Sequence, residues 1–166
     1  MSGTARLQMS LLTTGQAQKE VTVNEALQTL DVLTAGAVEE GPRQDPPASP
    51  DVGSCYIVGS SPTGEWAGKP QFVAAFTGGG WRLLPPIEGM SLYVKADGQW
   101  ANYRANTWEI GTLRGSSLMI GGQQVVGQRS AAIADPAAGS TIDVEARAAI
   151  GDILGALRQH GLIAQS

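Results

Sequence analysis

The chain has few of the residues on which catalytic and metal sites are usually built. Its 166 residues include one cysteine, Cys55, and one histidine, His160. The single cysteine excludes a disulfide within the chain, and one histidine without a cysteine pair argues against a zinc site. No serine lies in a nucleophile-elbow pattern. We therefore expect no cofactor, no bound metal and no enzymatic activity, and we interpret Cys55 as a small buried side chain.

Charge and long apolar runs are also scarce. Charged residues make up 16% of the chain, the net charge is -4, and the 11 basic residues are scattered along it. Because no basic cluster could neutralise phosphates, we expect no binding to nucleic acid. No run approaches the roughly 20 apolar residues of a membrane helix, and the N-terminus lacks the apolar segment of a signal peptide. The sequence thus predicts a chain that is made in the cytoplasm and does not insert into a membrane.

A first helix is predicted for about residues 22–38, within an N-terminal arm-and-helix segment of residues 1–44. Thr22 and Glu25 have the spacing of a capping box, in which each side chain satisfies a free backbone amide of the other. The apolar positions advance by three and four residues, as in a helix that packs lengthwise on another helix. They include Val23, Ala26, Leu30, Leu33 and Ala37. Since a short helix is rarely stable alone in water, it needs a partner within the chain or from another copy.

Residues 45–111 are expected to form an aromatic-rich antiparallel β module, because glycine-containing turns separate short apolar runs. The predicted strands lie at 55–58, 72–76, 81–84, 92–95, 99–103 and 107–110. We interpret them as one meander that places aromatic residues opposite each other on neighbouring strands. The expected pairs are Phe76 with Trp81, Tyr93 with Trp100, and Tyr103 with Trp108.

The last predicted segment, residues 112–166, combines a hairpin at 117–126 with a helix at about 144–160. Asp143 is the expected N-cap of this helix, and Gly161 the residue that ends it. The predicted fold class is α+β, with an N-terminal helix, an antiparallel meander, a small hairpin and a C-terminal helix. Both helices carry seams that suit a pair within one chain as well as a contact between subunits. The candidate oligomer seam comprises Val23, Leu30, Leu33, Ile150, Ile153 and Leu157.

The four tryptophans are the remaining candidates for a binding role, because an exposed indole can stack on a sugar ring. Trp81 and Trp108 fall on return strands and are expected in the core. Trp66 lies in a glycine-rich turn and is the first candidate for exposure. Trp100 is expected to be intermediate in exposure between Trp66 and the two core tryptophans. The candidate glycan or partner contacts are therefore Trp66 and Trp100. Nothing in the spacing of the nearby carboxylates selects the pair that glycoside hydrolysis needs.

Several blocks of the sequence resemble the DUF2793 family, an uncharacterised phage and prophage family found mostly in alphaproteobacteria. The resemblance is carried by Gly15-Gln16-Ala17-Gln18-Lys19, Asn24-Glu25-Ala26-Leu27, Leu30-Asp31, Trp66-Ala67-Gly68-Lys69 and Gly79-Gly80-Trp81-Arg82. The end of the chain, from Val125-Val126-Gly127 through Ala134-Asp135-Pro136 to Ile163, is similar to the C-terminal segment of phage tail-fibre proteins. Both resemblances imply a protein of the virion, attached to either tail or head.

Three functions follow as hypotheses from these observations. The first is a structural phage protein, a short tail-fibre or spike component that forms a homotrimer, contacts other virion proteins and takes part in host attachment. The alternative is a carbohydrate-binding module that recognises a host surface polysaccharide through exposed tryptophans. An enzyme acting on such a glycan is the third, and no set of residues supports it.

Overall fold

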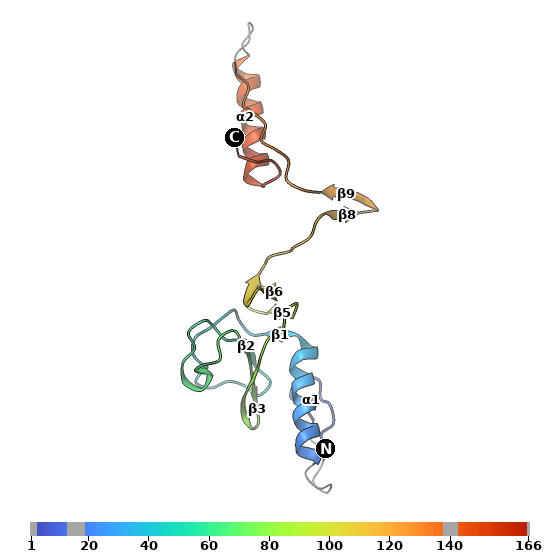
Figure 1. Ribbon diagram of the computed structural model, residues 1–166, viewed down its shortest axis with the longest axis vertical. Coiled ribbons are helices and arrows are strands. Elements are labelled where there is room, and N and C mark those ends of the chain that lie inside the picture. The colour runs from blue at the N-terminus through green and yellow to red at the C-terminus, as the bar shows by residue number, and fades with distance from the viewer. Residues whose placement is uncertain (1–2, 13–18, 138–142, 166) are drawn as a thin grey trace. The chain divides into compact units, whose positions relative to one another are not determined.

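The structure, a computed structural model, describes residues 3–12, 19–137 and 143–165. It divides into two compact units, Met1–Thr112 and Leu113–Ser166 (Figure 1). The division falls one residue from the predicted start of the C-terminal segment. The predicted segments 1–44 and 45–111 pack together in the first unit, because α1 and the strands share one core.

The first helix, α1, spans Lys19–Ala35 and thus begins and ends earlier than predicted. Thr22 lies inside the helix, so the predicted capping box is wrong: Lys19 and Glu20 are good helix formers that extend the helix upstream. The helix ends at Ala35 because Gly36 adopts a φ of 48°, the left-handed conformation that commonly follows a helix. Ala37 and Val38, predicted as the last helical turn, form strand β1 instead.

The strands of the N-terminal unit form two sheets, so the predicted single meander is wrong in this respect. Their bounds are β1 Ala37–Val38, β2 Cys55–Ile57, β3 Val73–Thr77, β4 Gly80–Leu84, β5 Ser91–Val94, β6 Gln99–Arg104 and β7 Thr107–Ile110. One sheet has the order β2-β3-β4 and the other β1-β5-β6-β7, with β1 parallel to β5. Pro85 and Pro86 follow β4 and lack amide donors, so strand β4 ends at Leu84.

The local pairing inside these sheets confirms the predicted hairpins. Three aromatic pairs lie directly opposite each other in the register: Phe76 and Trp81, Tyr93 and Trp100, Tyr103 and Trp108. Their ring centroids are 5.0, 5.6 and 5.2 Å apart. Such contacts contribute about 0.5–1.5 kcal/mol each beyond the burial of area.

Two hydrophobic clusters form the core of the N-terminal unit. The larger cluster combines Val32 of α1 with inward side chains of both sheets, among them Val38, Cys55, Ile57, Val73, Leu92, Val94, Tyr103 and Trp108. The smaller cluster lies on the other face of β2-β3-β4 and contains Tyr56, Val58, Trp66 and Ala74. Strand β2 is therefore buried on both faces, as its continuous apolar sequence requires.

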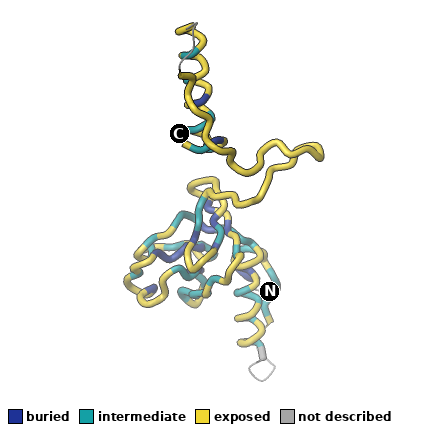
Figure 2. Tube along the Cα trace, turned by 45° about the horizontal axis from the view of Figure 1, so that its top comes forward, coloured by how far each residue is buried: buried dark blue, intermediate teal, exposed yellow. Residues whose placement is uncertain are grey.

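The C-terminal unit consists of the hairpin β8 (Leu118–Ile120) and β9 (Gln123–Val126), followed by α2 (Val144–Gln159). Gly121 and Gly122 both have positive φ, as a two-residue hairpin turn requires. The amide of Ala146 donates to Oδ1 of Asp143 at 2.8 Å, which confirms the predicted N-cap. Among the described residues of this unit, Leu154 and Ile163 are the buried apolar side chains. Figure 2 shows exposed residues along nearly all of it.

Candidate functional site

The β8–β9 hairpin presents apolar side chains on both of its faces. The exposed fractions lie between 43% and 62% for Leu118, Met119, Ile120, Val125 and Val126. Because neighbouring residues of a strand point to opposite faces, neither face of the hairpin is a polar one. An isolated two-stranded hairpin is marginal in water even with one covered face. The hairpin is therefore a surface that needs a partner.

Helix α2 adds further exposed apolar residues to the same unit. Of the predicted seam residues, Ile150 and Ile153 are 44% and 59% exposed, and Leu157 is half-buried. One face of α2 packs within the unit through Leu154, which is 5% exposed. The α2 residues that were predicted to form the oligomer seam are therefore largely exposed in the single chain.

Arg158 fastens the preceding loop to α2. Its Nη1 donates to Asp135 Oδ1 at 3.0 Å and its Nη2 to the carbonyl of Ile133 at 2.6 Å. The chain end joins this arrangement, because the amide of Ser130 donates to the carbonyl of Leu162 at 2.9 Å. No local sequence pattern indicates these contacts, because they join residues more than twenty positions apart. The unit thus has a defined shape but a very small core.

Helix α1 also leaves its predicted seam open. Val23, Leu30 and Leu33 are 40%, 51% and 39% exposed, whereas Asp31 and Val32 on the other side of the helix are buried. The apolar side chains at steps of three and four residues therefore point away from the core of their own unit. This is a second apolar surface, separate in sequence from that of residues 113–166.

The inward face of α1 holds the N-terminal arm through Asp31. This buried carboxylate accepts hydrogen bonds from Thr4 Oγ1 at 2.7 Å and from the amides of Arg6 and Leu7 at 2.9 and 2.6 Å. The guanidinium of Arg6 donates to Cys55 Sγ at 3.1 Å. A cavity of about 240 Å³ adjoins these groups. Since Asp31 and Arg6 are engaged with the chain itself, we interpret the cavity as part of the scaffold.

Cys55 is fully buried, as predicted. Burial raises the pKa of its thiol, and the nearby charge of Arg6 opposes this effect only in part. A thiol that stays protonated is a poor nucleophile and a poor metal ligand. Cys55 is therefore a core residue.

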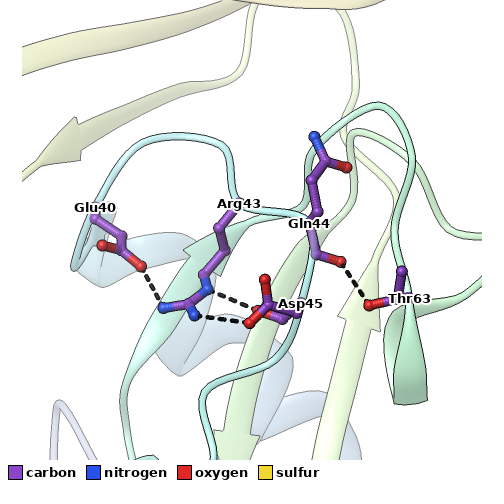
Figure 3. A network of polar contacts seen from close by, with 5 residues as sticks. All are labelled: Glu40, Arg43, Gln44, Asp45 and Thr63. Atoms are coloured by element: carbon purple, nitrogen blue, oxygen red, sulfur yellow. Dashed lines mark hydrogen bonds and ion pairs between the residues drawn. The ribbon is translucent and has the colours of Figure 1, made fainter.

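Arg43 belongs to another structural network, in the segment that follows β1 (Figure 3). Its guanidinium forms ion pairs with Glu40 and Asp45 and lies 5.7 Å from the ring centroid of Tyr56. The carbonyl of Gln44 accepts from the amide of Thr63 at 2.8 Å. The carboxylates of Glu40 and Asp45 both pair with Arg43 of the same segment, so we interpret the network as one that stabilises the loop after β1.

The exposure of the tryptophans agrees only in part with what the sequence predicts. Trp66 is fully buried, so its predicted exposure is wrong. The short helix Gly64–Trp66 turns the indole inward, where its ring centroid lies 5.0 Å from that of Trp81 and 5.9 Å from that of Tyr56. Trp66 therefore offers no face to a ligand. Trp108 is 7% exposed and confirms its assignment to the core, while Trp100 is 53% exposed.

Titratable groups do not gather into a recognisable reactive site in the part of the chain that the structure describes. Within residues 3–12, 19–137 and 143–165, no three His, Cys, Asp or Glu side chains are close enough to hold a metal ion. His160, at the end of α2, is exposed. None of the helices in these ranges is long and apolar enough to cross a membrane. The features that stand out are the two apolar surfaces and the exposed Trp100.

Comparison with known proteins gives a family for the N-terminal unit. A family model described as a protein of unknown function, DUF2793, matches residues 23–109. The match covers the whole predicted α1 seam, which begins at Val23, and all but the last residue of the strands in the two sheets of the N-terminal unit. No curated protein is significantly similar to the chain. Since the matched region is more than half of the chain, the protein belongs to the DUF2793 family.

Proposed function

We propose that the protein is a structural component of a phage particle, a short tail-fibre or spike subunit that assembles as a homotrimer. The observation that carries the proposal is the exposed apolar surface of residues 113–166. The resemblance of this segment to the C-terminus of phage tail-fibre proteins supports the same assignment. On this proposal the chain is made in the host cytoplasm and functions in the virion, bound to copies of itself and to other virion proteins.

The apolar surface is large in proportion to the core beside it. Among the described residues of this unit, eleven large apolar side chains are exposed by 43% or more: Leu113, Leu118, Met119, Ile120, Val125, Val126, Ile133, Val144, Ile150, Ile153 and Leu162. Full burial of a wholly exposed side chain of this kind contributes about 1.5–3 kcal/mol, and most of these side chains are already about half buried, so association gains about half of that for each. Burial of about ten would therefore roughly offset the 4–15 kcal/mol that association costs in lost rigid-body freedom. A stable assembly must cover most of the eleven.

A second copy of the chain is the partner that fits this surface best. Residues on both faces of the hairpin and along α2 are apolar, so a flat contact on one side would leave part of them in water. Three copies winding around a common axis can cover a hairpin and a helix from several sides at once. The α1 seam of Val23, Leu30 and Leu33 provides a second contact for the same assembly or for another virion protein.

The solution mass tests the proposal. Light scattering on a sizing column should give three times the 17.2 kDa chain mass, unchanged on dilution. The double variant Ile150→Asp/Ile153→Asp should reduce the mass to that of one chain. Ile87→Asp is the matched control, because Ile87 is 68% exposed but belongs to the N-terminal unit.

The four tryptophans all lie in the N-terminal unit, so their fluorescence shows whether that unit stays folded in each variant. A wild-type chain that is monomeric at micromolar concentration would refute self-assembly. A trimer that survives the double substitution would place the contact elsewhere, with the α1 seam as the next surface to test through Leu30→Glu.

A further inference from the structure

One face of the sheet β1-β5-β6-β7 is not used by the core. Leu92, Val94, Ala101, Tyr103 and Trp108 point inward and are buried. Because side chains alternate along a strand, the residues between them lie on the opposite face. This outer face carries Ser91, Tyr93, Lys95, Trp100, Asn102, Arg104, Thr107 and Glu109.

Two aromatic residues lie at the centre of this face. Tyr93 and Trp100 are opposite each other in the register and are 38% and 53% exposed. Their ring centroids are 5.6 Å apart, and the ring planes meet at 69°. The rings therefore form a corner, in which one ring can lie flat against a ligand while the other borders it. By contrast, Trp108 of the neighbouring aromatic pair is buried and Trp81 is half-buried.

A hydrogen-bond donor is held beside this corner. Asn102 lies two residues from Trp100 on the same face of β6, and its Oδ1 accepts a hydrogen bond from Ser91 Oγ at 2.6 Å. This bond engages the oxygen and orients the amide, whose Nδ2 is the donor side of the same group. The face thus combines an exposed indole with an oriented amide. A sugar ring offers the complementary groups, namely an apolar C–H face and hydroxyl oxygens at its rim.

The charges of the face favour a neutral ligand. Lys95 Nζ is 2.8 Å from Glu39 Oε1, so its charge is compensated. Arg104 and Glu109 add one charge of each sign. The whole chain has a net charge of -4, which disfavours a polyanion at long range. A polymer of sulfated sugars or uronic acids would meet no excess of positive charge here.

We propose that the outer face of this sheet binds a neutral polysaccharide, with one sugar ring in the Tyr93–Trp100 corner and a sugar hydroxyl on Asn102 Nδ2. The proposal rests on the fibre or spike function proposed above and adds to it the surface and the class of ligand through which such a subunit would attach to a host. Because the two rings form a corner, the face suits a single polysaccharide chain in solution. The flat surface of a crystalline polysaccharide would need two coplanar aromatic rings on the protein. A protein partner fits less well, because a stable protein interface buries roughly 800 Å² per partner around an apolar centre, and here two aromatic rings lie among polar groups.

The full-length protein can be tested on an array of neutral and acidic glycans, followed by native gel electrophoresis through dextran, mannan or polygalacturonate. We expect binding to at least one neutral glycan and retardation by a neutral polymer. Trp100→Ala should weaken this binding by at least about tenfold, as truncation of an aromatic anchor does, and Asn102→Ala should weaken it by a smaller factor. Ile87→Ala, which removes an exposed apolar residue outside the face, should bind like the wild type.

Each outcome bears on the proposal. Absence of binding to every neutral glycan, preference for acidic glycans, or binding that Trp100→Ala leaves intact would overturn it. A loss of oligomer mass in Trp100→Ala without glycan binding by the wild type would also overturn it, by identifying the face as a protein contact. Because the mass is measured in the same samples, a monomer that still binds glycan would refute trimeric assembly and support this inference.

Discussion

Replacement of Trp66 by alanine should destabilise the N-terminal unit by about 3–5 kcal/mol, the range for truncating a buried tryptophan. The side chain has no exposed surface and is the largest fully buried one in the chain. Its ring contacts with Trp81 and Tyr56 would be lost together with the buried area. The resulting cavity lies under the loop of residues 59–71, on the outer face of β2-β3-β4.

Phenylalanine at this position should be much less harmful. Trp66 Nε1 is buried, and no described residue accepts a hydrogen bond from it. An unsatisfied buried donor costs about 1–3 kcal/mol, and Trp66→Phe removes this donor while keeping an aromatic ring. The gain offsets part of the lost packing, so we expect a net destabilisation below about 2 kcal/mol.

Urea unfolding followed by tryptophan fluorescence and far-UV circular dichroism would measure these differences in the full chain. The matched control is Trp100→Ala, which removes the same side chain from a half-exposed position and should cost less, about 1–2 kcal/mol, because it loses the ring contact with Tyr93 and only part of a side chain's burial. The reasoning is refuted if Trp66→Ala costs no more than Trp100→Ala, because Trp66 would then be as accessible as the sequence suggests. It is also refuted if Trp66→Phe is as harmful as Trp66→Ala.

Three further predictions concern the scaffold. Asp31→Ala should lower the free energy of unfolding by about 2–4 kcal/mol, because it leaves three donors of the N-terminal arm without their acceptor. Hydrogen exchange should become faster at the amides of the arm. Unchanged exchange there would contradict the role assigned to Asp31. In the folded chain the Cys55 thiol should stay protonated above its ordinary pKa of 9.0. The free energy of unfolding should therefore fall as the pH rises from about 9 through the raised pKa. This dependence of stability on pH should vanish in Cys55→Ala. Gly36→Ala should cost about 1 kcal/mol, because its φ of 48° strains a residue with a side chain. No clash adds to this cost, since the nearest atom to the added Cβ, the carbonyl oxygen of Leu33, is 3.8 Å away. Gly151→Ala inside α2 should instead stabilise the chain, because the added Cβ meets nothing within 4 Å; thermal unfolding measures both.

The features that could be predicted from the sequence are those that depend on nearby residues. The hairpins form where Asp97-Gly98 and Gly121-Gly122 provide turn residues, and α2 begins where Asp143 can accept from an amide three residues on. The aromatic pairs follow from the same turns, because a short turn determines which residues face each other. The candidate contact Trp100 is exposed for a local reason as well, since it alternates with the buried Ala101.

Apart from the start of α1, the features that were missed depend on residues distant in sequence. β1 pairs with β5, and no local pattern distinguishes a strand of two residues from the end of a helix. The burial of Trp66 arises because a loop folds over a sheet. A signal for it was present: the run Cys55-Tyr56-Ile57-Val58 is apolar on both faces, so something had to cover Tyr56 and Val58 on the far side. The first large apolar residue that follows this run is Trp66.

The parallel pairing of β1 with β5 has a consequence for the order of events during synthesis. Ala37 finds its partner only when Tyr93 has left the ribosome, whereas each hairpin can close as soon as its own two strands exist. Since contacts between distant residues form slowly, helix α1 must wait beside an unfinished sheet. Until then both its inward side and its open seam face solvent. If the chain assembles as proposed above, contact between copies through the α1 seam should follow the pairing of β1 with β5, because before that pairing the inward side of α1 is exposed as well.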